Sequence, residues 1–126
     1  MRILPCLLAL SLAAAGGVRA EESYVPKAGF KPVIVPRPGD KGVYTLLDAW
    51  REGPDRVVLV SKREGPSGIN YTRRSLDCRR RRARDLGLGD TVAEMMRDKP
   101  GEPEWDLVDG SSADLVGRAA CRTAAR

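Results

Sequence analysis

The chain has 126 residues, a formal net charge of +5 and no histidine. A chain of this length forms at most one small domain. The lack of histidine excludes Ser-His-Asp and Cys-His catalysis as well as histidine metal ligands. Because the chain is also small and its carboxylates are scattered along the sequence, we expect a protein that is not an enzyme, uses no cofactor and holds no metal ion.

The first 20 residues have the pattern of an export signal. Arg2 is followed by an apolar block over Ile3–Val18, and the small-x-small sequence Val18-Arg19-Ala20 ends it. This order predicts a signal peptide over residues 1–20 that is cleaved after Ala20. The block is shorter than the ~20 apolar residues that span a bilayer, and Cys6 lies before most of it, which is a poor place for lipidation. We expect a periplasmic or secreted mature protein of bacterial type.

Two cysteines, Cys78 and Cys121, remain after the predicted cleavage. An even pair in an oxidising compartment predicts a disulfide. The bond would close a loop of 43 residues, which is worth roughly 4 kcal/mol in the loop-entropy model. Redox-active pairs usually have C-x-x-C spacing, so we interpret this pair as structural.

The first mature segment, residues 21–41, is a proline-rich arm. It contains four prolines and two glycines, and proline favours extended backbone without a donor. Val33–Val35 is apolar enough to lie along a sheet edge, where proline is tolerated. The segment is either a tether or an edge strand.

A series of short strands follows the arm. We expect strands over Gly42–Trp50, Arg56–Lys62, Ile69–Leu76 and Cys78–Leu86. The sequence Arg-Glu-Gly-Pro recurs at 51–54 and 63–66, and Gly-Pro marks turns. Short apolar runs with turns at this spacing predict an antiparallel meander.

The C-terminal part is predicted to end in a helix. Residues 91–98 fit either a short helix or a strand, and Glu104–Val108 is expected to be the last strand. A capping box at Ser111–Asp114 predicts a helix that runs to about Ala124. The fold class is therefore α+β, over residues 42–126: a small antiparallel sheet with a C-terminal helix tethered by the disulfide.

A dense run of arginines stands out between residues 73 and 84. Seven cations face a single acid, Asp77, which gives this segment a charge of +6. Without the signal peptide's two arginines the chain carries +3, so the remaining mature residues together carry −3. Side chains alternate between the two faces of a strand. On the expected strand from Cys78, Arg80, Arg82 and Arg84 would therefore share a face with Cys78, and Arg79 and Arg81 would lie on the other face. The run consists of Arg73, Arg74, Arg79, Arg80, Arg81, Arg82 and Arg84.

The arginine run has two interpretations. Guanidinium groups bind phosphate, sulfate and carboxylate bidentately, so the run is a candidate site for lipopolysaccharide phosphates, anionic glycans or an acidic protein. Alternatively it is a solvated face whose arginines pair with nearby acids. The expected partners are Asp85, Asp90, Glu64 and Glu94. Nucleic acid is disfavoured as a partner by the export signal and by the lack of interleaved aromatic residues.

The order of landmarks over Gly42–Cys121 resembles the surface-adhesin protein E family of small secreted bacterial domains. The landmarks are Tyr71, Ser75-Leu76-Asp77-Cys78, Leu86-Gly87-Leu88-Gly89, Trp105, Val108-Asp109-Gly110-Ser111 and Ala119-Ala120-Cys121. The resemblance implies the same sheet, helix and disulfide. It also implies a relation to adhesion, because the founding member binds matrix proteins such as vitronectin and laminin. The chain departs from that pattern in lacking a lipidation cysteine and in its proline-rich arm and arginine run.

Two functions follow from these observations. The first is an exported binding or adhesin-like module that contacts an anionic or protein partner through the arginine run. The second is an accessory envelope protein without a ligand, similar to the cryptic neisserial protein-like group, which has a comparable Tyr…Cys…Trp…Cys layout. No segment after residue 20 has the sequence of a membrane span, and the oligomeric state stays open.

Overall fold

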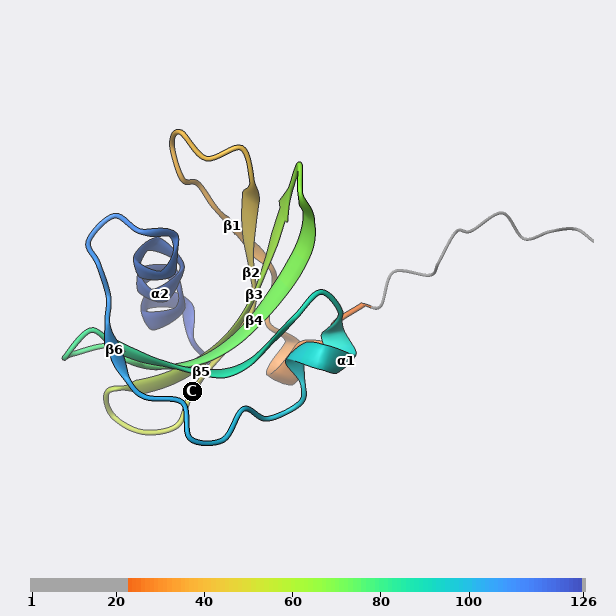
Figure 1. Ribbon diagram of the computed structural model, residues 1–126. Coiled ribbons are helices and arrows are strands. Elements are labelled where there is room, and N and C mark those ends of the chain that lie inside the picture. The colour runs from red at the N-terminus through yellow and green to blue at the C-terminus, as the bar shows by residue number, and fades with distance from the viewer. Residues whose placement is uncertain (1–22, 126) are drawn as a thin grey trace, which may run out of the picture.

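The computed structural model describes residues 23–125 and contains one six-stranded antiparallel sheet with helices on both faces (Figure 1). The strands pair in chain order from β1 to β6, which confirms the predicted meander and the α+β class. The predicted signal peptide lies outside the described residues. The elements are η1 (Lys27–Gly29), β1 (Val33–Val35), β2 (Val43–Arg51), β3 (Arg56–Gly65), β4 (Gly68–Asp77), β5 (Arg82–Gly89), α1 (Val92–Met95), β6 (Trp105–Asp106) and α2 (Ser112–Thr123).

The proline-rich arm supplies the edge strand of the sheet. Val33 pairs with Leu46 of β2 in antiparallel register, so the edge-strand alternative is correct. Upstream of β1, the hydroxyl of Tyr24 and the N–H of Lys27 both donate to Asp48 Oδ2 at 2.7 Å. The arm therefore packs on the same sheet that it begins.

The repeated Arg-Glu-Gly-Pro sequence makes turns at both of its positions. The first copy lies between β2 and β3. At the second copy Gly65 pairs with Gly68 across a two-residue loop, and Gly68 has a φ of +114°. Glycine adopts this backbone conformation without a steric cost, which explains its position in this tight hairpin.

Helix α2 covers one face of the sheet, and α1 and η1 lie on the other (Figure 1). The α2 side holds the main apolar core, in which Leu46, Leu59 and Leu76 are buried against Val116 and Ala120. Side chains alternate between the faces of a strand. Val58 and Val60, on either side of Leu59 in β3, therefore face the α1 side of the sheet, where they too are buried.

Both helices of the C-terminal half begin with a side-chain cap, and the predicted capping box at Ser111 is confirmed. Thr91 accepts a hydrogen bond from the N–H of Glu94 at the start of α1, so the ambiguous segment is a short helix. Ser111 accepts from the N–H of Asp114 at the start of α2. The predicted last strand is shorter than expected, because only Trp105–Asp106 pairs with β5.

One predicted strand is wrong in its first four residues. Residues 78–81 form a turn, and β5 begins at Arg82. The expected alternation of arginines on a strand from Cys78 therefore applies only from Arg82 onward. Within residues 23–125, no helix combines the length and apolar character needed to cross a bilayer.

Candidate functional site

The turn between β4 and β5 is held by the side chain of Asp77. Its Oδ1 accepts from the backbone N–H groups of Arg79 and Arg80 at 3.0 and 2.8 Å. These bonds, with that of Arg80 contributing most, hold the pKa of Asp77 below its usual range. Asp77 also accepts from the N–H of Arg81 through its backbone carbonyl at 2.8 Å. The turn therefore has a fixed backbone.

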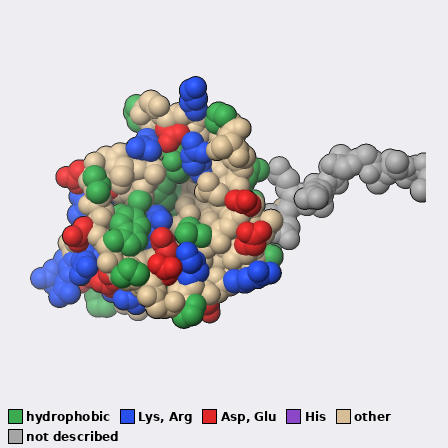
Figure 2. Space-filling model, in the orientation of Figure 1, with side chains coloured by type: hydrophobic (Ala, Val, Ile, Leu, Met, Phe, Trp, Pro, Cys, Tyr) green, Lys and Arg blue, Asp and Glu red, His purple; other side chains and the backbone are tan. Residues whose placement is uncertain are grey.

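Arg79 and Arg80 are the exposed cations of this turn. Both residues are exposed, and neither side chain forms an ion pair with another residue of the described chain. Figure 2 shows basic side chains projecting from the molecule where Figure 1 places the β4–β5 turn. These two guanidinium groups are available to an external anion.

Arg73 lies on the α1 side of the sheet and holds the segment around α1. Its Nη2 lies 2.7 Å from Asp98 Oδ1 and donates to the carbonyl of Leu86 at 3.2 Å. A further bond, from Nε, reaches the carbonyl of Met95 at 3.4 Å. This side chain is only 14% exposed, so Arg73 is a structural contact between sheet and helix.

Arg74 faces the opposite side, toward α2. Its Nε lies 2.7 Å from Asp85 Oδ1 on the neighbouring strand, as the interpretation with paired charges predicted. The guanidinium lies over the Trp105 ring, 4.9 Å from the ring centroid. Arg73 and Arg74 thus point to different faces and do not form a common strip.

Arg82 and Arg84 share one face of β5 and contact acids of the segment around β6. Glu104 lies 3.7 Å from Arg82 and 3.6 Å from Arg84. Arg82 Nε is also 3.3 Å from Asp106 Oδ1. That nitrogen is buried and makes no hydrogen bond to a described residue, so the contact is an ion pair only. These two arginines therefore have internal carboxylate partners.

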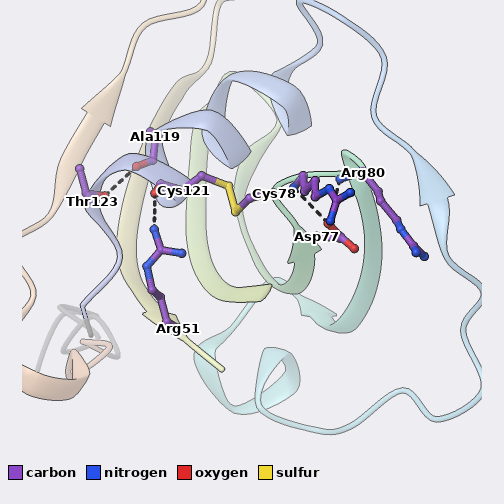
Figure 3. The surroundings of a disulfide bond; sticks show 8 residues. Arg51, Asp77, Cys78, Arg80, Ala119, Cys121 and Thr123 are labelled. Atoms are coloured by element: carbon purple, nitrogen blue, oxygen red, sulfur yellow. Dashed lines mark hydrogen bonds between the residues drawn. A yellow bond between two sulfur atoms is a disulfide. The ribbon is translucent and has the colours of Figure 1, made fainter. Parts of the chain in front are cut away.

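The disulfide joins this turn to the last turns of α2. Cys78 begins the turn and is bonded to Cys121 (Figure 3), as predicted. Arg51 of β2 donates to the carbonyl of Cys121 at 3.0 Å, which adds a second link between the helix and the sheet. The first residue of the turn is consequently held against α2.

A groove of about 290 Å³ lies between α2 and the β4–β5 turn, beside the disulfide. Its apolar lining comes from Leu76, Leu107 and Gly117. A Cβ added at Gly117 would lie 3.0 Å from Leu76 Cδ2, so the glycine allows the helix to approach the sheet closely. We call this the disulfide groove. Its charged lining consists of Asp77, Arg81, Asp114, Arg118 and Arg122.

The buried carboxylate of Asp114 orients two arginines of the disulfide groove. The residue is 1% exposed, accepts from the Gly110 N–H at 2.9 Å and contacts Arg118 at 3.1 Å and Arg81. Burial alone would raise the pKa of Asp114, but the Gly110 N–H, then Arg118 and Arg81, bring it below its usual range. Asp114 is therefore charged, and it fixes both guanidinium groups.

Two arginines of this site were missed from the sequence. Arg118 and Arg122 follow Asp114 at intervals of four residues, which places all three on one side of a helix. That spacing was a readable signal. The sequence did not show that this side of α2 faces the β4–β5 turn.

Comparison with known proteins adds no relative. No protein-family model, no curated protein and no solved structure matches this chain. The resemblance to the surface-adhesin protein E family stays a prediction.

Proposed function

We propose that this chain is an exported bacterial binding module, without enzymatic activity, that contacts an acidic segment of a protein partner through its β4–β5 turn. The observation that carries the proposal is the difference among the seven arginines of the run. Five have carboxylate partners within the chain, whereas Arg79 and Arg80 project into solvent from a turn with a fixed backbone. Exposed cations on a rigid support favour recognition of an anion.

The adjoining disulfide groove supports a partner with both acidic and apolar side chains. Its lining combines apolar residues with the cations Arg81, Arg118 and Arg122. Interfaces commonly seat an apolar anchor in a pocket and surround it with polar contacts. A segment with one apolar side chain between carboxylates would place the anchor in the groove and the carboxylates on the arginines.

The charge distribution supports the same kind of partner. The segment 73–84 carries +6, while the other residues after position 20 carry −3 in sum. A local positive field accelerates encounter with an acidic surface and orients it. The resemblance to a family of secreted adhesins supports the same class of function.

Binding of a labelled peptide tests this proposal. One peptide alternates glutamate and leucine, and a matched peptide alternates glutamine and leucine. The wild type should bind the first and not the second. Arg79→Ser with Arg80→Ser should weaken binding about tenfold, because an exposed charge pair contributes up to about 1 kcal/mol.

A matched control removes two exposed cations elsewhere. Lys31→Ser with Arg97→Ser changes the net charge equally and should leave the affinity unchanged. Equal binding of the two peptides, or equal loss in both variants, would contradict the proposal. Binding of a sulfated polysaccharide without binding of the acidic peptide would assign the turn to a glycan instead.

A structural role in the envelope is the second candidate. The disulfide and the ion pairs of Arg73 and Arg74 favour this structural role, because they join parts of the same chain and stabilise its fold. Under this alternative, neither peptide and no polyanion binds the wild type. The peptide experiment therefore separates the two candidates.

A further inference from the structure

A second recess, distinct from the disulfide groove, lies between the first turn of α2 and the sheet. It has a volume of about 240 Å³, and Figure 2 shows a hollow in the corresponding face. We call it the polar hollow. Its polar lining includes Ser61, Arg63, Asn70, Thr72, Arg74 and Ser112.

Several hydrogen-bonding groups in the polar hollow are unused. Ser61 and Thr72 face each other across β3 and β4, and within the described part of the chain neither hydroxyl has a hydrogen-bond partner. Ser61 is only 8% exposed. Asn70 lies opposite Arg63 in the same register. Thr72 is half-buried and Asn70 is exposed, so these hydroxyl and amide groups are accessible from the polar hollow. Both kinds of group donate and accept hydrogen bonds, which makes them available to a ligand.

Arg63 is held in place by Tyr44, which also lines the polar hollow, and by Asp40, which does not. Its Nε donates to the Tyr44 hydroxyl at 3.2 Å, and its Nη2 lies 3.1 Å from Asp40 Oδ1. The Tyr44 hydroxyl in turn donates to Asp40 Oδ2 at 2.9 Å. The Nη1 group of Arg63 makes no hydrogen bond to a described residue, so it is a donor with a fixed position.

Arg74 is fixed in a similar way on the other side of the polar hollow. Asp85 accepts from its Nε at 2.7 Å, and the Trp105 ring lies against its guanidinium plane. Neither Nη group makes a hydrogen bond to a described residue. The polar hollow is thus lined by two arginines and by no carboxylate.

We propose that the polar hollow binds a single sugar ring that carries one anionic group. The free donors of Arg63 and Arg74 match a carboxylate or phosphoryl group, which guanidinium binds at two oxygens. Hydroxyl and amide side chains both donate and accept, as ring hydroxyls do. The volume lies below the about 300–1,000 Å³ of typical ligand pockets, which limits the ligand to a small molecule or one terminal ring.

Titrations followed by protein NMR test this inference with four probes: D-glucuronate, glucose 1-phosphate, D-glucose and inorganic phosphate. At least one of the two anionic sugars should bind about tenfold more tightly than glucose and than phosphate. Comparison of glucuronate with glucose 1-phosphate distinguishes a carboxylate ligand from a phosphoryl ligand. Equal affinity for glucose, or for inorganic phosphate, overturns the proposal.

Variants locate the binding. Ser61→Ala with Thr72→Val removes two hydroxyls that make no hydrogen bond to a described residue. This variant should lower the affinity for the sugar about tenfold. Thr45→Val with Ser67→Ala is the matched control, because neither residue lines the polar hollow. Arg74→Lys keeps the positive charge beside Asp85 but cannot form a bidentate hydrogen bond to the anionic group, so it should lower the affinity for the sugar as well.

The outcome is independent of the proposed peptide site. Arg79→Ser with Arg80→Ser should bind the anionic sugar as the wild type does, because neither residue lines the polar hollow. Loss of sugar binding in that variant, or full binding in Ser61→Ala with Thr72→Val, would overturn the assignment.

Discussion

Arg81, in the β4–β5 turn, directs its guanidinium onto the buried carboxylate of Asp114 in the first turn of α2. Arg81 has a φ of +57°, an uncommon backbone conformation for a residue with a side chain. The ion pair and the disulfide connect the same turn to opposite ends of one helix. The arginines of the proposed binding surface are thus positioned by contacts with α2.

Replacement of the buried acid should destabilise the fold. We expect Asp114→Asn to lower the free energy of unfolding by about 2 kcal/mol, less than the about 3–5 kcal/mol of a fully buried pair, because both arginines are partly exposed. Asp109→Asn removes an acid that is 84% exposed and contacts the same arginines, and it should cost under about 1 kcal/mol. Urea denaturation measures both. Equal losses of unfolding free energy in the two variants would contradict the larger contribution that we assign to the buried acid Asp114.

The same acid predicts a pH dependence. Asp114 has a folded pKa below that of the unfolded chain, as does Asp40, whose pKa of about 2 results first from the Gly42 N–H. Such groups stabilise the fold above the unfolded pKa of about 3.9, and their contribution disappears as pH falls toward the folded pKa. Unfolding free energies at pH 5 and pH 3 should differ less in Asp114→Asn than in the wild type. An unchanged difference would contradict the assignment.

The disulfide should contribute a large part of the stability. Cys78→Ser with Cys121→Ser should lower the free energy of unfolding by about 2–5 kcal/mol, the range seen when a native disulfide is removed from a small domain. The bond fixes the β4–β5 turn against α2, so peptide binding should weaken too. Urea denaturation of the variant and of the oxidised wild type gives the comparison. The same midpoint in both would mean that the bond does not constrain the chain.

Gly87 allows α1 to pack on the sheet. A Cβ at this position would lie 1.9 Å from the Met95 carbonyl oxygen, so Gly87→Ala must displace α1. We expect a loss of about 1–3 kcal/mol, as for other overpacked sites, with faster amide exchange around Met95. Gly53→Ala meets no atom within 4 Å and is the control. Unchanged exchange in Gly87→Ala would contradict the close approach.

Much of the fold could be predicted from local sequence signals. The repeated Gly-Pro turns, the capping residues Thr91 and Ser111, and the cysteine pair identify most of the elements. The turn at 78–81 could not, because no glycine or proline marks it. It is formed by hydrogen bonds to the Asp77 side chain, which local composition does not reveal.

The site was harder to predict than the fold. The sequence shows a dense arginine run, but not which members have partners. Arg73 contacts Asp98 and Arg84 contacts Glu104, acids that lie 20 or more residues away. Such pairings depend on the packing of α1 and β6 against the sheet, so only the structure separates Arg79 and Arg80 from the rest.

Mapping the peptide on the protein by NMR tests the central claim most directly. The alternating glutamate–leucine peptide should shift the amide signals of residues 78–82 and 117–122, and a rise in salt should weaken binding because exposed charges are screened. Shifts confined to other surfaces, or an affinity that salt leaves unchanged, would contradict the assignment of the β4–β5 turn as the binding site.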